Sequence, residues 1–307
     1  MKLDGIHHIT AITGDARRNL DFYTRVLGLR LVKKTVNQDD PTAYHLFYSD
    51  EEGRPGSDLT FFEYPGARRG RPGAGMIYRV VYRVASPDAL HFWETRLRGE
   101  GVTPSGDDRR LTFADPEGLG LEIAVTETED EPLVAHHPEI PREHALQGFD
   151  GVHAHSADPA ASRRFLEETL GFTRMREGSY VARGSHRGSF YTYEEANRVG
   201  IPGAGTVHHV AWASPMEEHE AWRQRVLEGG VFPTPVIDRF YFRSIYFREP
   251  SGILFEIATL GPGFAADEPL EHLGERLSLP PRFEPLRGEL EQALTPLPNP
   301  REGWVRA

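Results

Sequence analysis

The sequence contains no cysteine at all. Disulfide bonds, thiolate nucleophiles, cysteine-ligated zinc and iron–sulfur clusters are therefore excluded. Basic residues are also the minority, because 35 Lys and Arg stand against 46 Asp and Glu and give a formal net charge of -11. Such a charge does not suit binding to a phosphate backbone, so we expect no nucleic-acid partner.

Long apolar runs are absent as well. No stretch of the sequence reaches the length of a membrane span, and residues 1–5 carry no apolar segment of the kind that a signal peptide has. Apolar residues still make up 38% of the 307 residues, which is enough for a packed core. We expect a cytoplasmic protein without membrane contact, large enough for two ordinary domains.

The sequence does contain an internal repeat. Five blocks recur in the same order, with an offset that falls from about 146 to about 129–134 residues, as expected if the loops differ in length. The paired blocks are residues 5–9 and 151–155, 27–29 and 170–172, 72–75 and 202–205, 101–102 and 230–231, and 115–123 and 249–257. We interpret the chain as an N-terminal module at residues 1–126, a linker at 127–147, a C-terminal module at 148–260 and a tail at 261–307.

Both modules have the same expected secondary structure. A short strand, at residues 5–12 in the first module and 149–156 in the second, leads into a helix and further strands. A second strand and helix follow, and a hairpin closes the module. Residues that suit the starts of these helices are Asp15, Ser86, Asp158 and Ser214. The pattern is a βαβββ unit used twice in each module, so the expected fold class is α+β.

The closing hairpins allow a finer prediction. The loop at residues 250–252, with proline first and glycine last, suits a three-residue turn. Counting outward from this turn places Tyr246 directly opposite Glu256. The same register in the first module places Thr112 opposite Glu122.

Two histidine pairs, His7-His8 and His208-His209, lie in apolar strand patterns. Because neighbouring strand residues face opposite ways, only one member of each pair is expected to line a given cavity. His209 shares its face with two alanines, which leave room for a ligand, and His8 shares its face with the polar Thr10. His208 shares its face with bulky apolar residues, which indicates packing under a helix. The histidines expected to be only solvated or locally hydrogen-bonded are His91, His136, His137, His219 and His272.

A carboxylate completes this candidate site. Glu256 lies in an apolar strand pattern, so it is expected to be paired or metal-bound if it is buried. Neither module alone supplies two histidines and a carboxylate, but His8 from the first module with His209 and Glu256 from the second does. This combination is the facial triad of Fe(II) oxygenases. The residues that remain at the equivalent positions are Arg79, Glu122 and Ala154. This set holds a cation less well, because the arginine is itself positively charged.

The same residues allow a simpler interpretation. These side chains could simply lie in a core in which every buried polar group has a hydrogen-bond partner. The histidines would then bond to the backbone, and Glu256 would pair with Arg239 or Arg243. The closest rival to His8 as a ligand is His155, one residue beyond the position that aligns with His8.

In combination, these motifs resemble the hydroquinone-type ring-cleaving dioxygenases of the vicinal oxygen chelate superfamily, whose modules are glyoxalase-like. The resemblance extends over essentially the whole chain. The motifs that carry it are residues 7–10, 207–209, 241–246, 250–252 and 255–256. It implies tandem glyoxalase-like modules built from paired βαβββ units that form open β-barrels.

The resemblance also implies Fe(II) bound by His8, His209 and Glu256, and Mn(II) suits the same ligands. It implies a dihydroxybenzene as the small aromatic substrate, with a para-diol favoured over a catechol, and O2 as the second substrate. The supporting residues that it implies are His7, Thr10, His208, Arg239 and Tyr246. Strand parity places Arg239 and Tyr246 on opposite faces, unless Arg239 precedes the strand or a bulge intervenes.

Two other functions fit the same scaffold. One is a glyoxalase-like lyase or isomerase, which usually uses four protein ligands for its metal. The other is a non-enzymatic small-molecule-binding resistance protein, which needs no metal. A homo-oligomer is compatible with the sequence, and neither the composition nor the spacing of the motifs names the substrate.

Overall fold

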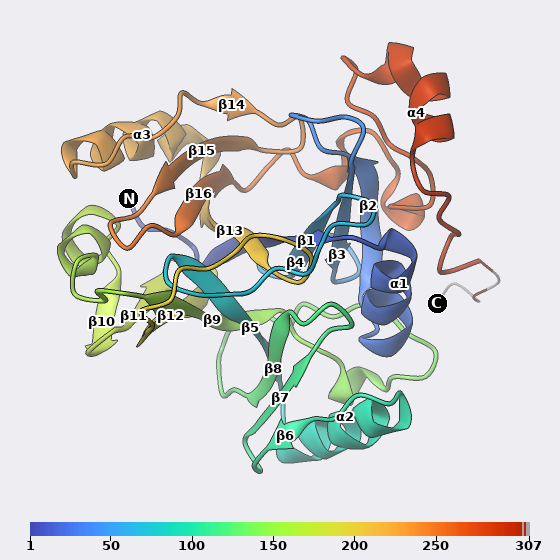
Figure 1. Cartoon of the computed structure of the whole chain (residues 1–307), viewed down its shortest axis with the longest axis horizontal. Helices are drawn as coiled ribbons and strands as arrows, with labels where there is room; N and C mark the ends of the chain where they lie inside the picture. Colours follow the sequence, from blue (N-terminus) through green and yellow to red (C-terminus); the bar gives the residue numbers. More distant parts are fainter. Residues whose placement is uncertain (303, 305–307) are drawn as a thin grey trace.

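The computed structural model describes residues 1–302 and 304, and its strands form two eight-stranded sheets (Figure 1). The first sheet combines strands from the two ends of the chain, in the order β14-β15-β16-β13-β1-β4-β3-β2. Its strands are β1 (Ile6–Thr13), β2 (Arg30–Val36), β3 (Tyr44–Ser49), β4 (Asp58–Glu63), β13 (Val207–Ser214), β14 (Ile237–Asp238), β15 (Arg243–Arg248) and β16 (Leu254–Thr259).

The second sheet has the same plan and is built from the middle of the chain, in the order β10-β11-β12-β9-β5-β8-β7-β6. Its strands are β5 (Met76–Val84), β6 (Ser105–Gly106), β7 (Arg110–Ala114), β8 (Gly120–Val125), β9 (Phe149–Ser156), β10 (Thr173–Arg176), β11 (Ser179–Arg183) and β12 (Gly188–Glu195). In both sheets the two central strands pair antiparallel, β1 with β13 and β5 with β9.

The expected α+β fold with four βαβββ units is confirmed. The two units that share a sheet come from different copies of the repeat, because β1–β4 pair with β13–β16 and β5–β8 pair with β9–β12. Side chains from the start and the end of the chain therefore meet on one sheet. The limits of the modules, linker and tail, at residues 1–126, 127–147, 148–260 and 261–307, stay a prediction about the sequence repeat.

Short helices cover the outsides of the sheets and the connections. The α-helices are α1 (Ala16–Asp21), α2 (Pro87–Gly99), α3 (His219–Glu228) and α4 (Arg287–Ala293), and two π-helices are η1 (Phe22–Val26) and η3 (Phe165–Thr169). The 3-10 turns are η2 (Arg142–His144), η4 (Met216–Glu218), η5 (Phe264–Ala266), η6 (Leu270–His272) and η7 (Glu284–Leu286). Within the described residues, none of the helices is both long and apolar enough to cross a membrane.

The starts of the helices follow the capping residues. Asp15 accepts a hydrogen bond from the backbone N–H of Arg18, and Ser86 accepts one from the backbone N–H of Ala89. Asp158 accepts a hydrogen bond from the N–H of Ala160, but the segment that follows contains the π-helix η3. Near Ser214, a 3-10 turn precedes α3.

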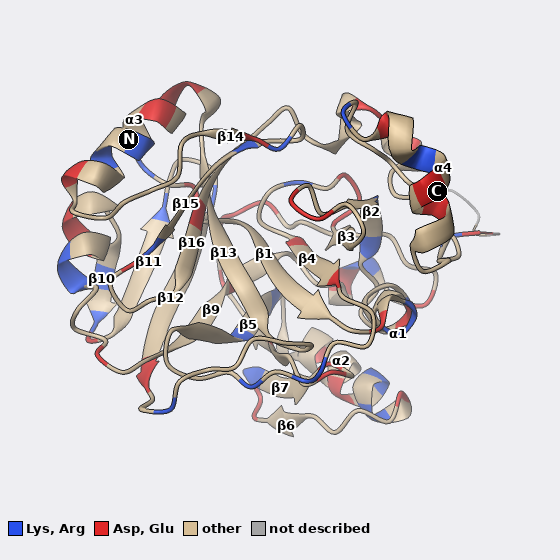
Figure 2. Ribbon diagram, turned by 45° about the horizontal axis from the view of Figure 1, so that its top comes forward, with Lys and Arg blue, Asp and Glu red and all other residues tan. Residues whose placement is uncertain are grey.

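The cores of the two halves are packed from both the sheets and the helices. Trp93 of α2 and Trp222 of α3 are fully buried, where α2 contacts β8 and α3 contacts β16. Charged residues lie mainly on the outer helices and loops of the ribbon, whereas the central strands carry few of them (Figure 2). Glu256 of the candidate site is a charged residue on a strand near the middle of the first sheet.

The segment after β16 packs against the first sheet. Lys33 of β2 is fully buried, where its ammonium group pairs with Asp267 at 2.8 Å and also with Glu268. Asp267 in turn accepts a hydrogen bond of 2.9 Å from the hydroxyl of Tyr241. A buried lysine needs such partners. This C-terminal segment therefore fixes Tyr241, which lines the cavity of the candidate site.

Candidate metal centre

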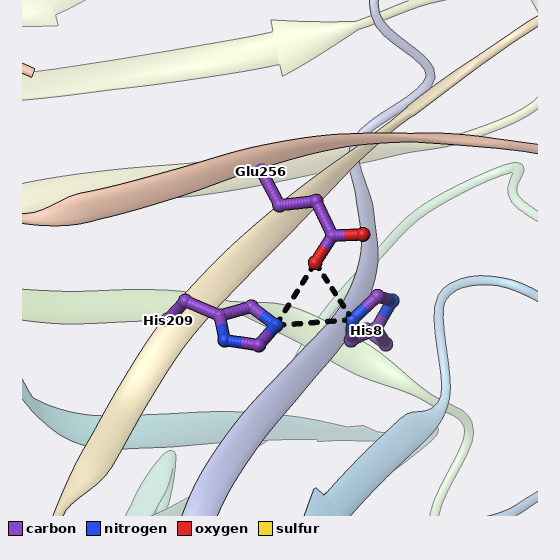
Figure 3. Close-up of side chains that lie close together, drawn as sticks. All are labelled: His8, His209 and Glu256. Atoms are coloured by element: carbon purple, nitrogen blue, oxygen red, sulfur yellow. Dashed lines mark hydrogen bonds and ion pairs between the residues drawn. The ribbon is translucent and has the colours of Figure 1, made fainter. Parts of the chain in front are cut away.

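Three side chains converge on the first sheet: His8 from β1, His209 from β13 and Glu256 from β16 (Figure 3). Oε2 of Glu256 lies 2.9 Å from Nε2 of His209 and 3.2 Å from Nε2 of His8, and the two Nε2 atoms are 3.3 Å apart. The three residues are 0–4% exposed. They come together because β16, β13 and β1 are consecutive strands of the sheet.

The spacing of these atoms fits a single metal ion. Donor atoms that hold one ion at about 2.1 Å in neighbouring octahedral positions lie about 3.0 Å apart. The observed separations of 2.9–3.3 Å match one face of such an octahedron. Among the described residues, His8, His209 and Glu256 are the one group of histidine and carboxylate side chains that can hold a metal ion in this way.

Bulges in β1 and β13 orient the two histidine pairs. The register passes from Ile6 opposite Trp212 to His8 opposite Ala211, so His7 is the extra residue on β1. Further along, it passes from Thr10 opposite His209 to Ala11 opposite Val207, so His208 is the extra residue on β13. A bulge interrupts the alternation of side chains across a strand. The alternation is therefore broken at both pairs, but the prediction that one member of each pair lines a cavity is confirmed, because His8 and His209 line it and His7 and His208 do not.

The two histidines at the bulges both contact the candidate ligands. Nδ1 of His7 lies 2.9 Å from Nδ1 of His8, and Nδ1 of His208 lies 2.8 Å from Nδ1 of His209. His208 is exposed, so its expected packing under a helix is wrong, and its ring contacts Phe62 at a centroid distance of 5.6 Å. Each of the two candidate histidine ligands thus contacts a second histidine through its Nδ1 atom.

The hydrogen bonds of His7 determine which nitrogen of His8 is free for a metal. Nε2 of His7 lies 3.0 Å from the backbone oxygen of Thr259, which can only accept, so this nitrogen carries a proton. Burial and the neighbouring His8 lower the pKa of His7 to about 3, so its ring is neutral and Nδ1 accepts. Nδ1 of His8 must therefore donate, which leaves the lone pair on Nε2 of His8 for a metal.

Glu256 is held by a residue that the sequence patterns did not single out. The Ser244 hydroxyl donates to Oε1 of Glu256 at 2.5 Å, so Oε2 is the oxygen that faces the histidines. Burial would raise the pKa of Glu256, but His8 and His209 hold it well below its usual range. Ser244 lies two residues before Tyr246 on β15, so strand parity could have found it.

Tyr246 lies directly opposite Glu256, and this predicted register is confirmed. Nε of Arg239 donates to the Tyr246 hydroxyl at 3.3 Å, while the rest of its guanidinium group binds both oxygens of Asp39 at 2.8 and 2.9 Å. Arg239 therefore pairs with Asp39, and not with Glu256 as it would in the alternative without a metal. Arg239 can reach Tyr246 because it lies before β15 and is not bound by the alternation of that strand. The next residue, Phe240, also precedes β15 and has a positive φ of 69°.

Thr10 faces the same side of the sheet but contacts no candidate ligand through its hydroxyl. Its Oγ1 lies 2.8 Å from Oγ1 of Thr60, which in turn lies 2.9 Å from Nε2 of His45. His45 was not expected at the site, because its strand β3 is two strands away from β1 and no motif connects the two.

A cavity opens beside the candidate ligands. The space between its walls, counted together with its open mouth, is about 410 Å³. Its walls are His8, Thr35, Asn37, Gln38, Asp39, His45, Phe47, Phe62, His209, Arg239, Tyr241, Phe242 and Tyr246. The many aromatic rings among them suit a flat, apolar ligand with few polar groups.

The equivalent place on the second sheet has a different chemistry. Oε2 of Glu122 lies 3.2 Å from Arg79, and Oε1 lies 2.8 Å from Arg110. Arg110 is opposite Ala124 in the hairpin, as Ser244 is opposite Ala258 in the other sheet. Two guanidinium groups therefore take both oxygens of Glu122, and Ala154 offers no ligand. His155 stacks on Tyr78 at a ring distance of 3.9 Å in this second sheet.

We expect the change Glu122→Gln to leave bound metal, and any activity that depends on it, within a few-fold of the parent protein. Glutamine keeps the shape of the side chain, but it removes the charge and one of the two oxygens that accept from Arg79 and Arg110. Among the described residues, neither arginine forms an ion pair with a candidate metal ligand. Elemental analysis of the purified, folded variant tests this expectation. A large loss of metal would mean that the second sheet contributes to the working site.

Known proteins match this chain over its whole length. The family model of the Glyoxalase/Bleomycin resistance protein/Dioxygenase superfamily matches residues 5–123 and 148–257. The "Putative ring-cleaving dioxygenase MhqO" of Bacillus subtilis is 44% identical over 313 residues, which are 96% of this chain and 97% of that protein. The "Chlorohydroquinone/hydroquinone 1,2-dioxygenase" of Sphingobium indicum is 33% identical over 315 residues, which are 94% of this chain and 95% of that protein.

Solved structures also match this chain. The crystal structure of a "putative dioxygenase" from Bacillus subtilis is 42% identical, covers 97% of this chain and 98% of its own, and superposes with a TM-score of 0.91. Glyoxalase I of maize, at 16% identity and a TM-score of 0.58 over 89% of this chain and 96% of its own, shares the fold. The chain belongs to the Glyoxalase/Bleomycin resistance protein/Dioxygenase superfamily.

Proposed function

We propose that this protein is an Fe(II)-dependent ring-cleaving dioxygenase that acts on a dihydroxybenzene with O2. The observation that carries the proposal is the buried set of His8, His209 and Glu256, with ligand atoms 2.9–3.3 Å apart. Three protein ligands on one face of an octahedron leave positions for a substrate oxygen and for O2. The names of the relatives that match nearly the whole chain support the same activity.

The residues behind the ligands would keep this geometry. His7 connects His8 to the backbone oxygen of Thr259, and Ser244 holds Oε1 of Glu256 so that Oε2 points to the metal position. Partners of this kind orient metal ligands and set their protonation. When bound, Fe(II) would supply adjacent positions for the diol and O2 and a path for electron density between them. Mn(II) fits the same ligands.

The residues in front of the ligands would bind and orient the ring. The cavity walls next to His8 include Phe242, whose ring lies 5.1 Å from that of His8. Tyr246 is opposite Glu256, and Arg239 holds its hydroxyl in place. Burial raises the pKa of Tyr246, so this hydroxyl keeps its proton and can donate to a substrate oxygen.

Oxygen uptake tests the proposal. The enzyme, loaded with Fe(II) without air and then given O2, is expected to consume O2 in step with the loss of a hydroquinone or a catechol. No NADH should be required, because ring cleavage that incorporates both atoms of O2 takes all of its electrons from the diol. The measurement pairs an oxygen electrode with quantification of the remaining diol and of the bound metal.

Two results would overturn the proposal. An iron-loaded enzyme that consumes no O2 with any hydroquinone or catechol, yet isomerises a thiol adduct, would be a glyoxalase-like lyase. A metal-free protein that binds its ligand as tightly as the loaded protein and leaves the ligand unchanged would be a resistance-type binding protein.

A further inference from the structure

One buried hydroxyl in the cavity wall has no partner. Thr35 of β2 is 2% exposed and lines the cavity, and its Oγ1 makes no hydrogen bond with any of the described residues. A buried hydroxyl without a partner destabilises a protein and calls for an explanation. Because Thr35 lines a cavity, a ligand group that reaches its hydroxyl can supply the missing hydrogen bond.

Thr35 lies far from the candidate metal ligands within the same cavity. In the sheet order β1-β4-β3-β2, its strand is three strands away from β1, which carries His8. Thr35 is directly opposite His45, and His45 is directly opposite Phe62, so all three share the face that lines the cavity. A ring held between the two ends would present one edge to the metal ligands and the other to Thr35.

The other polar side chains at this end of the cavity are already engaged. Nε2 of His45 lies 2.9 Å from the hydroxyl of Thr60, and Asp39 pairs with Arg239. The amide of Asn37 donates to Tyr64 at 3.3 Å and accepts from the N–H of Asp39 at 3.0 Å. Gln38 donates to the backbone of Arg239 and accepts from Arg282. The hydroxyl of Thr35 therefore differs from its neighbours in being uncommitted.

The walls between the two ends favour an aromatic ring. The rings of Phe47 and Phe62 lie 4.0 and 4.4 Å from the ring of His45 and cover it. Burial lowers the pKa of His45 well below its usual value, so this wall carries no charge. A flat ring can pack here, and in the arrangement that we infer its far edge is directed toward Thr35.

We propose that Thr35 is a specificity-determining residue, whose hydroxyl binds the substrate oxygen farthest from the metal ligands and so selects para-dihydroxybenzenes. This inference rests on the proposed dioxygenase function and specifies its substrate class. A para-diol with one oxygen at the metal position carries the other on the opposite side of the ring, whereas a catechol carries both on the same side. A threonine hydroxyl can both donate and accept, so it suits a phenolic hydroxyl. A ring without that second oxygen leaves the buried hydroxyl unpaired, which disfavours its binding.

Binding without O2 tests this assignment directly. The Fe(II)-loaded parent, Thr35→Val and Thr35→Ser enzymes are titrated with hydroquinone and with phenol, which lacks the second hydroxyl. Valine keeps the shape of threonine and removes its hydroxyl. We expect Thr35→Val to weaken hydroquinone binding by about 2- to 10-fold, as the loss of one hydrogen bond does. Phenol binding should not weaken, and Thr35→Ser should restore the affinity for hydroquinone.

Two further measurements separate this role from simple packing. Because an unpaired buried hydroxyl is unfavourable, Thr35→Val should be at least as resistant to thermal unfolding as the parent enzyme. In turnover, the ratio of kcat/KM for hydroquinone to that for catechol should fall in Thr35→Val and recover in Thr35→Ser.

The assignment would be wrong if Thr35→Val weakened hydroquinone and phenol by the same factor, or lowered kcat/KM for hydroquinone and catechol equally. It would also be wrong if Thr35→Ser behaved like Thr35→Val. A failure of the dioxygenase proposal is read separately, from the absence of O2 uptake by the parent enzyme, because the binding titration needs no turnover.

Discussion

Replacing His8, His209 or Glu256 by alanine is expected to remove the metal and abolish turnover, while the protein stays folded. Each residue would supply one of three ligand atoms, and each of these atoms lies within 3.3 Å of the other two. Two ligands bind a divalent ion far more weakly than three, so the ion is lost during purification. The fold should survive, because the buried apolar residues that form the main hydrophobic core do not include these three side chains.

The measurement is the metal content of each purified variant, together with O2 uptake and circular dichroism. His155→Ala is the matched control, since this histidine was the closest rival to His8 in the sequence but lies on the second sheet against Tyr78. It should keep both metal and activity. Stoichiometric iron with near-normal turnover in any of the three alanine variants would show that the triad is misassigned at that position.

The sequence repeat predicted the essential arrangement of the site. The triad was assembled from different modules only because neither module alone supplies two histidines and a carboxylate. The structure explains why residues of both modules combine. The first and last βαβββ units share a sheet, in which β1 is next to β13 and β13 is next to β16. Local pattern and spacing also predicted the hairpin register of Tyr246 with Glu256, because a short turn leaves little freedom for the strands that it joins.

Other features of the site depend on contacts that no short pattern reveals. The bulges at His7 and His208 are exceptions to the alternation on which the prediction rested. The position of Arg239 follows from the left-handed conformation at Phe240, which an aromatic residue rarely adopts. Thr35 and His45 join the cavity through the curvature and order of the sheet, which pairing between distant strands determines.

The two sheets show how one repeat yields one candidate site. On the first sheet, Ser244 binds Oε1 of Glu256, and Oε2 is left to the two histidines. On the second sheet, guanidinium groups bind both oxygens of Glu122. The positive charge that a metal would bring is therefore already supplied there by the protein itself, and a second ion would be repelled.

Tyr246→Phe is expected to lower turnover while the metal stays bound. The Tyr246 hydroxyl is the group opposite Glu256 that can donate to a substrate oxygen, and Arg239 positions it at 3.3 Å. Burial and the nearby Glu256 raise the pKa of this tyrosine, so the hydroxyl is protonated at neutral pH. Phenylalanine removes the hydroxyl but no metal ligand, and the loss of one positioned proton-transfer group typically lowers a rate by roughly 10²–10⁴-fold.

Metal content and kcat, measured on the same sample, distinguish this role from ligand loss. Thr112→Val is the matched control, because Thr112 lies opposite Glu122 in the second sheet as Tyr246 lies opposite Glu256 in the first. That change should leave both quantities near those of the parent. A Tyr246→Phe enzyme with full metal and unchanged kcat would remove Tyr246 from the mechanism, whereas loss of metal would mean that its hydroxyl supports the ligands rather than the substrate. The ring of Tyr246 lies 5.7 Å from that of His209, and phenylalanine keeps this ring. Any change in metal content or in kcat is therefore assigned to the missing hydroxyl.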